Sequence, residues 1–253
     1  MESVAPRPLA VTADTRRVPA VMWVARGVGP APLVLLGHGG SGHKTATRQQ
    51  MLAERLAGAG VCVVAIDGPL HGERAPRPMA PGEYQAELVA RGMDIVVRDM
   101  VEDWTAAIAA ARATGAGDGG LGYLGMSMGT RFGLPLAAAL GHELACVVLG
   151  MFGLVQSEAL HPGLHDAAEL RACAAGVVAP TLWHVTWDDE LFARAGQFEL
   201  FDCVGAADKQ VVGFPGEHGT TSPDAVDAWI GFLVRHLIDR PGFDPGNQFA
   251  CRT

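Results

Sequence analysis

Apolar residues occur in short uninterrupted runs that alternate with segments of helical periodicity. The clearest runs lie at residues 33–36 and 61–66, and neither contains a charged side chain. Such runs are typical of strands that are buried on both faces of a parallel sheet. Residues 45–56, which lie between them, place their apolar side chains on one helical face and are followed by Gly58. The pattern therefore predicts a strand, a helix and a second strand in this order.

The same alternation continues along most of the chain. Further strands are predicted at residues 18–24, 121–124, 145–149, 181–185 and 209–214, and further helices at 95–113, 127–140, 165–175, 191–204 and from Ser222 onward. For the last helix, Ser222 is a typical N-cap residue and Pro223 suits the first helical position. Strands that alternate with helices form a mostly parallel sheet covered on both faces. We therefore expect an α/β fold with a doubly wound sheet.

Two stretches, residues 68–92 and 151–163, do not fit this alternation, and each follows a predicted strand. Ligands of doubly wound sheets bind outside the carboxyl ends of the strands. We expect both stretches to be loops that form the walls of a pocket, with a small cap or none. Residues 241–253 contain Gly and Pro without periodicity and are expected to form the irregular tail of a single domain that spans residues 1–253.

Composition narrows the class of partner. The 253 residues carry a formal net charge of -8 and lack the clustered Lys and Arg that bind nucleic acid. No apolar stretch reaches the roughly 20 residues of a membrane-spanning helix. The first ten residues contain two prolines and an arginine, whereas a signal peptide has an uninterrupted apolar stretch.

The chain has five cysteines, an odd number, and they are scattered along the sequence. This pattern is typical of reduced thiols in a cytosol. We expect a cytoplasmic protein that acts on a small molecule, with no nucleic-acid or membrane partner.

Residues 125–129, Gly-Met-Ser-Met-Gly, match the pattern G-x-S-x-G. A glycine-rich turn with an incidental serine would give the same letters. The predicted strand before the motif and the predicted helix after it favour a nucleophile, because a serine on a sharp strand-to-helix turn needs small neighbours. Ser127 is therefore the candidate nucleophile.

A serine hydroxyl is a weak nucleophile at neutral pH and needs a base. His218 is the candidate base, because it lies on a glycine-bounded loop between the last predicted strand and the last predicted helix. His184 falls inside a strand and is predicted to be a core residue, whereas His236 is predicted to be a partly exposed residue of the last helix. Asp188, Asp189 and Glu190 follow the strand that contains His184, and one of these three carboxylates is expected to orient the imidazole.

Three other motifs receive structural interpretations. Residues 37–45 are rich in Gly and end in Lys-Thr, but the phosphate-loop pattern GxxxxGK[ST] requires Gly where His43 stands. Residues 67–74 are expected to form a tight turn pinned by ion pairs. His161 and His165 have the spacing of two metal ligands on a helix, but the Pro-Gly between them disfavours that helix. No metal site is expected.

Four segments in chain order resemble the α/β-hydrolase superfamily. They are the glycine loop at 38–42, the turn at 125–129, Trp-Asp-Asp at 187–189 and Glu-His-Gly at 217–219. Their order and spacing cover nearly the whole chain, and its small size and residues 67–74 are similar to the compact dienelactone-hydrolase-like and esterase branch. Dienelactone hydrolases proper use a cysteine nucleophile, so Ser127 indicates ordinary ester or lactone chemistry instead.

The resemblance implies a triad in the order serine, acid, histidine, and no metal or organic cofactor. In related hydrolases the acid is commonly followed by two variable residues, an aliphatic residue and Pro. Asp189 fits this register better than Asp188, although Ala193 stands where Pro is expected. The unused Asp would then cap the helix that follows. The implied oxyanion donors are the backbone amides of Gly40 and Met128.

Five residues near the ends of predicted strands are candidates for contact with the substrate, namely Gly39, Ser41, Met126, Met151 and Phe152. We expect a carboxylic ester with a small or medium acyl group. A lactonase, thioesterase or acyltransferase with the same triad, and a noncatalytic binding protein of the same fold, are the alternatives. The oligomeric state is open, and a homodimer is compatible with the sequence.

Overall fold

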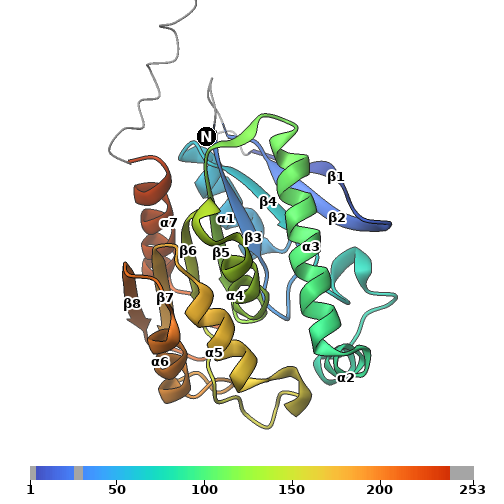
Figure 1. Ribbon diagram of the computed structural model, residues 1–253, viewed down its shortest axis with the longest axis vertical. Helices are drawn as coiled ribbons and strands as arrows, with labels where there is room; N and C mark the ends of the chain where they lie inside the picture. The colour runs from blue at the N-terminus through green and yellow to red at the C-terminus, as the bar shows by residue number, and fades with distance from the viewer. Residues whose placement is uncertain (1–3, 26–30, 240–253) are drawn as a thin grey trace, which may run out of the picture.

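The structure is a computed structural model that describes residues 4–25 and 31–239. Within these residues, eight strands form one sheet in the order β1-β2-β4-β3-β5-β6-β7-β8 (Figure 1). The strands are β1 (Arg7–Ala13), β2 (Arg16–Trp23), β3 (Ala31–Gly37), β4 (Cys62–Ile66), β5 (Ala116–Met126), β6 (Leu144–Gly150), β7 (Thr181–Thr186) and β8 (Lys209–Phe214). The helices are α1 (Thr47–Gly58), α2 (Pro81–Arg91), α3 (Met93–Arg112), α4 (Met128–Leu140), α5 (Ala167–Gly176), α6 (Arg194–Cys203) and α7 (Pro223–Leu237), with short 3-10 turns η1 (Gly72–Arg74), η2 (Gly141–Glu143) and η3 (Pro162–Leu164).

The sheet is parallel from β4 to β8 and antiparallel where β2 pairs with β1 and β4. Each connection between successive parallel strands contains at least one helix, which carries the chain back to the start of the next strand. Residues of α3, α4, α5 and α6 pack in one hydrophobic cluster, and residues of α1 and α7 pack in a second. The predicted doubly wound α/β fold is confirmed.

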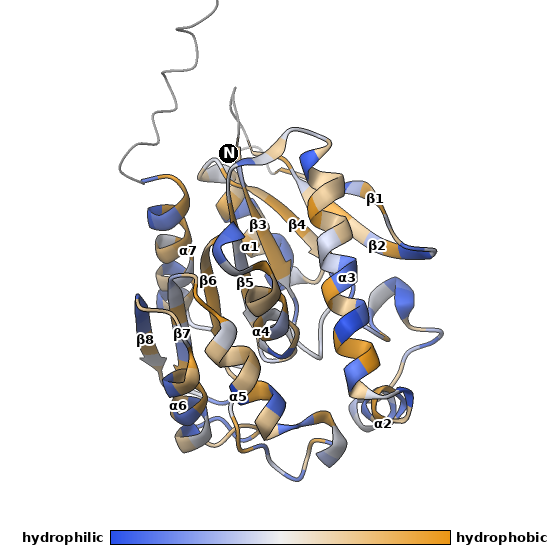
Figure 2. Cartoon of the chain, viewed as in Figure 1, coloured by the Kyte–Doolittle hydropathy of each residue, from blue (hydrophilic) through white to orange (hydrophobic). Residues whose placement is uncertain are grey.

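Strand β3 shows how the sequence creates two cores. Successive side chains of a strand point to opposite faces. Leu33 and Leu35 pack in the cluster beneath α3 and α4, whereas Val34 and Leu36 pack in the cluster beneath α1 and α7. A continuous apolar run is therefore required on β3, and Figure 2 shows the same concentration of hydrophobic residues on the neighbouring central strands.

Apart from the short 3-10 turns, one strand and one helix of the described residues were not predicted from the sequence. Strand β1 lies at the sheet edge and its N-terminal half is largely exposed, so it lacks the buried apolar run that marks the central strands. Helix α2 lies inside the stretch predicted to be a loop at residues 68–92. Pro81 occupies its first turn, where a missing N–H costs no hydrogen bond, so this proline begins a helix. Only Gln85 and Leu88 of α2 are buried, which left little periodicity to detect.

Two further predictions concern the cysteines and the C-terminal tail. Cys62 and Cys146 are buried and neither forms a disulfide, in agreement with the predicted reduced thiols. The predicted irregular tail, residues 241–253, lies outside the described residues. None of the helices in the described part of the chain is long and apolar enough to cross a membrane.

The start of α7 agrees with its sequence signal. The Ser222 side chain accepts a hydrogen bond from the Ala225 backbone N–H at 3.1 Å, Pro223 follows it, and Trp229 on the inner face is fully buried. Helix α7 packs against the strands that carry the site described below, so its first turn contributes to the stability of the whole fold.

We expect Ser222→Ala to lower the free energy of unfolding by about 1 kcal/mol, because it removes the acceptor of a helix N-cap. Urea denaturation followed by circular dichroism measures this change. Ser222→Asp is the matched control, since aspartate is an equally good cap and should leave stability close to that of the wild type. Equal stability of the alanine and aspartate variants would contradict the capping role.

Candidate active site

Ser127 lies on the sharp turn between β5 and α4, where its backbone adopts φ 58° and ψ -118°. A positive φ is unfavourable for a residue with a Cβ atom and persists only where the surroundings impose it. A Cβ atom on Gly125 would lie 2.8 Å from the Gly129 carbonyl oxygen, and one on Gly129 would lie 3.0 Å from that of Gly37. Gly125 is therefore required by close packing within the turn, and Gly129 by close packing of the turn against the end of β3.

The structure brings Ser127, His218 and Asp189 together from three distant parts of the chain. Ser127 Oγ lies 2.8 Å from His218 Nε2, and His218 Nδ1 lies 2.9 Å from Asp189 Oδ2. The distances allow the serine hydroxyl to donate to Nε2 while the Nδ1–H group donates to the carboxylate. The Asp189 side chain is fully buried, whereas Asp188 is exposed.

The carboxylate of Asp189 is also held by the backbone that follows it. Its Oδ1 atom accepts hydrogen bonds from the N–H groups of Leu191 at 2.9 Å and Phe192 at 2.8 Å. The prediction that the unused Asp caps the next helix is wrong. Helix α6 begins only at Arg194, after Ala193, and has no side-chain cap, because residues 187–193 form an irregular connection.

Glu190 is a site residue that the sequence did not single out. Its Oε2 atom accepts a hydrogen bond from the His218 backbone N–H at 2.8 Å. The loop that carries His218 is therefore fastened at its backbone by Glu190 and at its imidazole by Asp189. Adjacent acidic residues after β7 were the available signal, but nothing in the pattern assigned them two separate partners.

Glycines 39 and 40 form the loop after β3, beside Ser127. The Gly39 carbonyl oxygen lies 2.8 Å from His38 Nδ1 and accepts a hydrogen bond from the Gly42 N–H at 3.0 Å. Because a trans peptide group points its C=O and N–H in opposite directions, these contacts also fix the direction of the Gly40 N–H. The Met128 N–H belongs to the first turn of α4, where the helix itself provides no acceptor.

His38 carries the hydrogen-bond pattern of a neutral imidazole. The Gly68 N–H donates to its Nε2 atom at 2.8 Å, which leaves the ring proton on Nδ1 and directed to the Gly39 carbonyl. Burial lowers the pKa of His38 to about 4. The histidine therefore stays neutral around pH 7 and acts as a fixed link between the loop after β3 and the turn after β4.

The predicted turn at residues 67–74 is confirmed, including its ion pairs. Asp67 is fully buried and accepts from the Lys44 ammonium at 2.7 Å, the Lys44 N–H at 2.9 Å and the Glu73 N–H at 2.9 Å. Burial by itself would raise the pKa of the Asp67 carboxyl, but the hydrogen bonds from Lys44 and Glu73 bring it below its usual value. The turn is thus fastened to the loop that carries Gly39 and Gly40.

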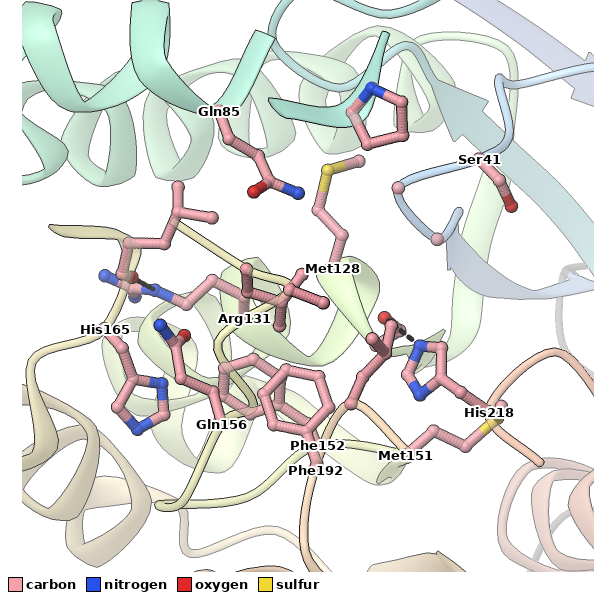
Figure 3. A pocket seen from close by; sticks show the side chains of 18 of the residues that line it. Ser41, Gln85, Met128, Arg131, Met151, Phe152, Gln156, His165, Phe192 and His218 are labelled. Carbon is pink, nitrogen blue, oxygen red and sulfur yellow. Dashed lines mark hydrogen bonds between the residues drawn. The ribbon is translucent and has the colours of Figure 1, made fainter. Parts of the chain in front are cut away.

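A cavity of about 390 Å³ opens beside Ser127 and His218. Four predicted contact residues line it, namely Gly39, Ser41, Met151 and Phe152. The other residues that line it and are central to its shape and polarity are Arg48, Tyr84, Gln85, Leu88, Arg131, Phe132, Gln156, Leu160, Leu164, His165 and Phe192. Figure 3 shows His218 on one side of the cavity and Arg131, Gln156 and His165 on the opposite side.

The prediction that Met126 lines the pocket is wrong. Its side chain is buried with Leu124 in the cluster beneath α1 and α7. Both residues belong to β5, and side chains two positions apart in a strand point to the same face. The alternation therefore directs Met126 into the core, although it stands next to Ser127.

The two irregular stretches form walls of this cavity, as predicted. Helix α2 contributes Tyr84, Gln85 and Leu88, and the segment after β6 contributes Gln156 and Leu160. Gln85 Oε1 accepts a hydrogen bond from the backbone of the second wall, at the N–H of residue 161, over 2.9 Å. The buried side-chain amide of Gln85 therefore links α2 to the segment after β6.

The described residues include no group of three or more His, Cys, Asp or Glu side chains arranged to hold a metal ion. His161 and His165 make local contacts instead. His161 Nδ1 accepts a hydrogen bond from the Gly163 N–H, and His165 Nε2 lies 2.9 Å from the Leu154 carbonyl oxygen.

Comparison with known proteins finds similar solved structures. No protein-family model and no curated protein sequence matches the chain. A cold-adapted esterase from an Arctic intertidal metagenomic library is 30% identical, with a TM-score of 0.78, and the match covers 94% of this chain and 96% of that one.

More distant relatives share the fold. A dienelactone hydrolase from Anabaena variabilis is 18% identical with a TM-score of 0.65, and the match covers 92% of this chain and 98% of that one. Est1E from Butyrivibrio proteoclasticus, solved with ferulic acid, is 13% identical with a TM-score of 0.68 and coverage of 90% and 98%. Given this fold and the 30% identical esterase that matches nearly end to end, the chain belongs to the α/β-hydrolase superfamily, in the branch of compact esterases and dienelactone hydrolases.

Proposed function

We propose that the protein is a serine hydrolase that cleaves a carboxylic ester through an acyl-enzyme intermediate. The observation that carries this proposal is the continuous chain of hydrogen bonds from Ser127 through His218 to Asp189 at the edge of the cavity. The similarity to a cold-adapted esterase supports the same class of reaction.

In the first step, His218 Nε2 takes the proton of Ser127 while Oγ attacks the ester carbonyl carbon. The imidazolium that forms is stabilised by Asp189, whose charge is adjacent to Nδ1 and shielded from water. His218 then gives the proton to the leaving alcohol, and a water molecule activated by the same imidazole hydrolyses the acyl-enzyme.

The tetrahedral intermediates carry a negative charge on the former carbonyl oxygen. We assign the amides of Gly40 and Met128 as its donors, because both residues line the cavity next to Ser127. The Gly40 N–H is directed by the fixed Gly39 carbonyl, and the Met128 N–H lies at the positive end of α4. Donors held before the reaction stabilise the oxyanion without reorganisation, and removing one typically costs about 100-fold or more in rate.

The cavity favours an apolar acyl group of small or medium length. Its volume of about 390 Å³ is at the small end of the range for ligand pockets, and apolar side chains, mainly leucine, methionine and phenylalanine, form much of its lining. Lactones, thioesters and acyl transfer use the same triad and are distinguished only by the substrate. A noncatalytic binding protein would not need the hydrogen bonds between Ser127, His218 and Asp189.

We expect Ser127→Ala to abolish turnover of 4-nitrophenyl esters and labelling by a fluorophosphonate probe, since both require the serine oxygen. Steady-state kinetics and mass spectrometry of the labelled protein measure these effects. Ser222→Ala is the matched control, because it removes a serine outside the site and should retain labelling. Turnover by a folded Ser127→Ala variant would contradict the assignment.

Asp189→Asn should lower kcat by about 10³-fold to 10⁴-fold, because a neutral amide cannot stabilise the imidazolium or hold the required tautomer. The asparagine oxygen can still accept from Leu191 and Phe192, so the fold should be retained. Asp188→Asn is the control, and its kcat should remain close to that of the wild type because Asp188 is exposed and away from the imidazole. Similar losses in both variants would disprove the choice of Asp189.

The position of Leu160 in the cavity wall predicts a shift in chain-length preference. We expect Leu160→Trp to lower kcat/KM for long acyl chains relative to acetate, and Leu160→Ala to raise it, because the pocket volume changes in opposite directions. Each methylene that can no longer be accommodated should cost about 10-fold or more. A series of 4-nitrophenyl esters from acetate to laurate measures the ratio. Parallel changes for all chain lengths would place the acyl group elsewhere.

A further inference from the structure

His71 lies between two backbone carbonyl groups, one on each side of its imidazole ring. Its Nε2 atom is 2.8 Å from the Gly40 oxygen and its Nδ1 atom is 2.8 Å from the Pro69 oxygen. The residue is buried, with 8% of its surface exposed. The distances are those of good hydrogen bonds at both ring nitrogens.

The two contacts constrain the protonation state of the ring. A carbonyl oxygen can only accept a hydrogen bond, and a neutral imidazole has one N–H donor and one nitrogen lone pair. A neutral His71 would therefore direct a lone pair at a carbonyl oxygen 2.8 Å away, with little water to separate them. The imidazolium has two donors and satisfies both carbonyls at once.

The charged groups near His71 are paired with one another. Asp67 and Glu73 of the same turn are paired with the Lys44 ammonium, and Glu73 is also paired with Arg17 at 3.1 Å. Arg74, which follows in the turn, is paired with Asp103 at 2.6 Å. The His38 ring, on the loop after β3, has its centroid 5.2 Å from that of His71. His38 is neutral because Gly68 donates to its Nε2 atom. The Tyr84 ring of α2 lies 4.6 Å from the imidazole and brings no charge.

The Gly40 contact connects this turn to the proposed oxyanion hole. The carbonyl of Gly39 is fixed by His38 and Gly42, and the carbonyl of Gly40 is next to His71. Gly40 therefore lies between two peptide groups that are each held by hydrogen bonds. The contacts of the Gly39 carbonyl fix the peptide group that contains the Gly40 N–H, and the His71 contact fixes the peptide group after it. Glycine has the widest backbone freedom of any residue, so without the His71 contact the chain can rotate at Gly40 and the loop can move the Gly40 N–H out of place. A Cβ atom at this position would lie 2.6 Å from the Tyr84 hydroxyl, so a larger residue would require the Tyr84 side chain to move.

The turn itself shows signs of external constraint. Leu70 has a φ of 60°, which is unfavourable for a leucine and is retained only when neighbouring contacts impose it. The His71 side chain provides such a contact on one side through Pro69, and its backbone N–H provides another by donating to the Gly68 oxygen at 3.1 Å.

We propose that His71 is a positioning residue that acts as an imidazolium, with one N–H holding the Pro69 carbonyl and the other holding the Gly40 carbonyl so that the Gly40 amide stays directed at the oxyanion. This role rests on the proposed ester hydrolysis. Loss of either donor leaves one carbonyl unheld and loosens the oxyanion hole. The rate of the chemical step should therefore fall when the donor that faces Gly40 is removed.

Nitrogen-15 NMR of the protein labelled at histidine tests the protonation state without using activity. Side-chain signals of His71 are assigned through the backbone of the wild type, and His142, which is exposed, is the internal reference. We expect both ring nitrogens of His71 to carry protons at the pH at which kcat is highest. A single protonated nitrogen at that pH would overturn the proposal, whether or not the protein proves to be an esterase.

Two matched variants test the positioning role. The amide of His71→Gln reaches as far as Nε2 and can donate to the Gly40 carbonyl, whereas the shorter amide of His71→Asn reaches only as far as Nδ1. We expect kcat to fall about 10-fold to 100-fold in His71→Asn and clearly less in His71→Gln, with KM nearly unchanged.

Equal kcat values in the two variants would overturn the proposal. His142→Gln is the control and should keep the wild-type kcat and KM. Failure of the proposed function would be recognised separately, because the wild type would then show no turnover that depends on Ser127. If either variant does not fold, the NMR result on the wild type still decides the protonation state.

Discussion

The strained backbone of Ser127 is the constraint on which the arrangement of the site depends. Two buried hydroxyl groups hold the turn around it. Tyr123 donates to the Gly129 carbonyl at 2.6 Å, and the Thr130 hydroxyl oxygen lies 2.7 Å from the Gly150 carbonyl. Burial raises the pKa of Tyr123, which keeps its proton available for this bond. Because β5 and α4 are fixed at this point, the side chain of Ser127 projects toward His218 while its neighbours remain in the core.

The fold was largely predictable, because the sheet requires a pattern that burial makes visible. A strand such as β4 is buried along its whole length and must be apolar at every position. Helix α2 faces the cavity and solvent more than the core, so burial imposes little pattern on it. The N-terminal half of edge strand β1 is also exposed, so burial imposes little pattern there. Because the apolar pattern of a sequence reflects burial, it identifies the elements of the core better than the elements that line a pocket.

The site was predictable to the extent that chain order and chemistry define it. The position of His218 after the last strand and the register of Asp189 were sufficient to select both residues. The wrong prediction for Met126 came from treating proximity in sequence to Ser127 as proximity to the cavity. The contacts of Glu190, His71 and Tyr84 depend on how separate loops meet in space, and no local pattern encodes that meeting.

The distribution of charge around the cavity is consistent with chemistry that passes through an anion. The chain carries a net charge of -8, yet among the described residues that line the cavity none is acidic, and Arg48 and Arg131 are both present. Arg131 is paired with Glu169 at 2.9 Å, and Arg48 donates to the Gly219 carbonyl at 3.2 Å. In the proposed mechanism, Asp189 acts on the reacting atoms only through His218. A carboxylate that faced the oxyanion directly would raise the energy of the transition state in this poorly solvated space. Because His218 lies between Asp189 and the reacting atoms, the carboxylate can stabilise the imidazolium without repelling the oxyanion.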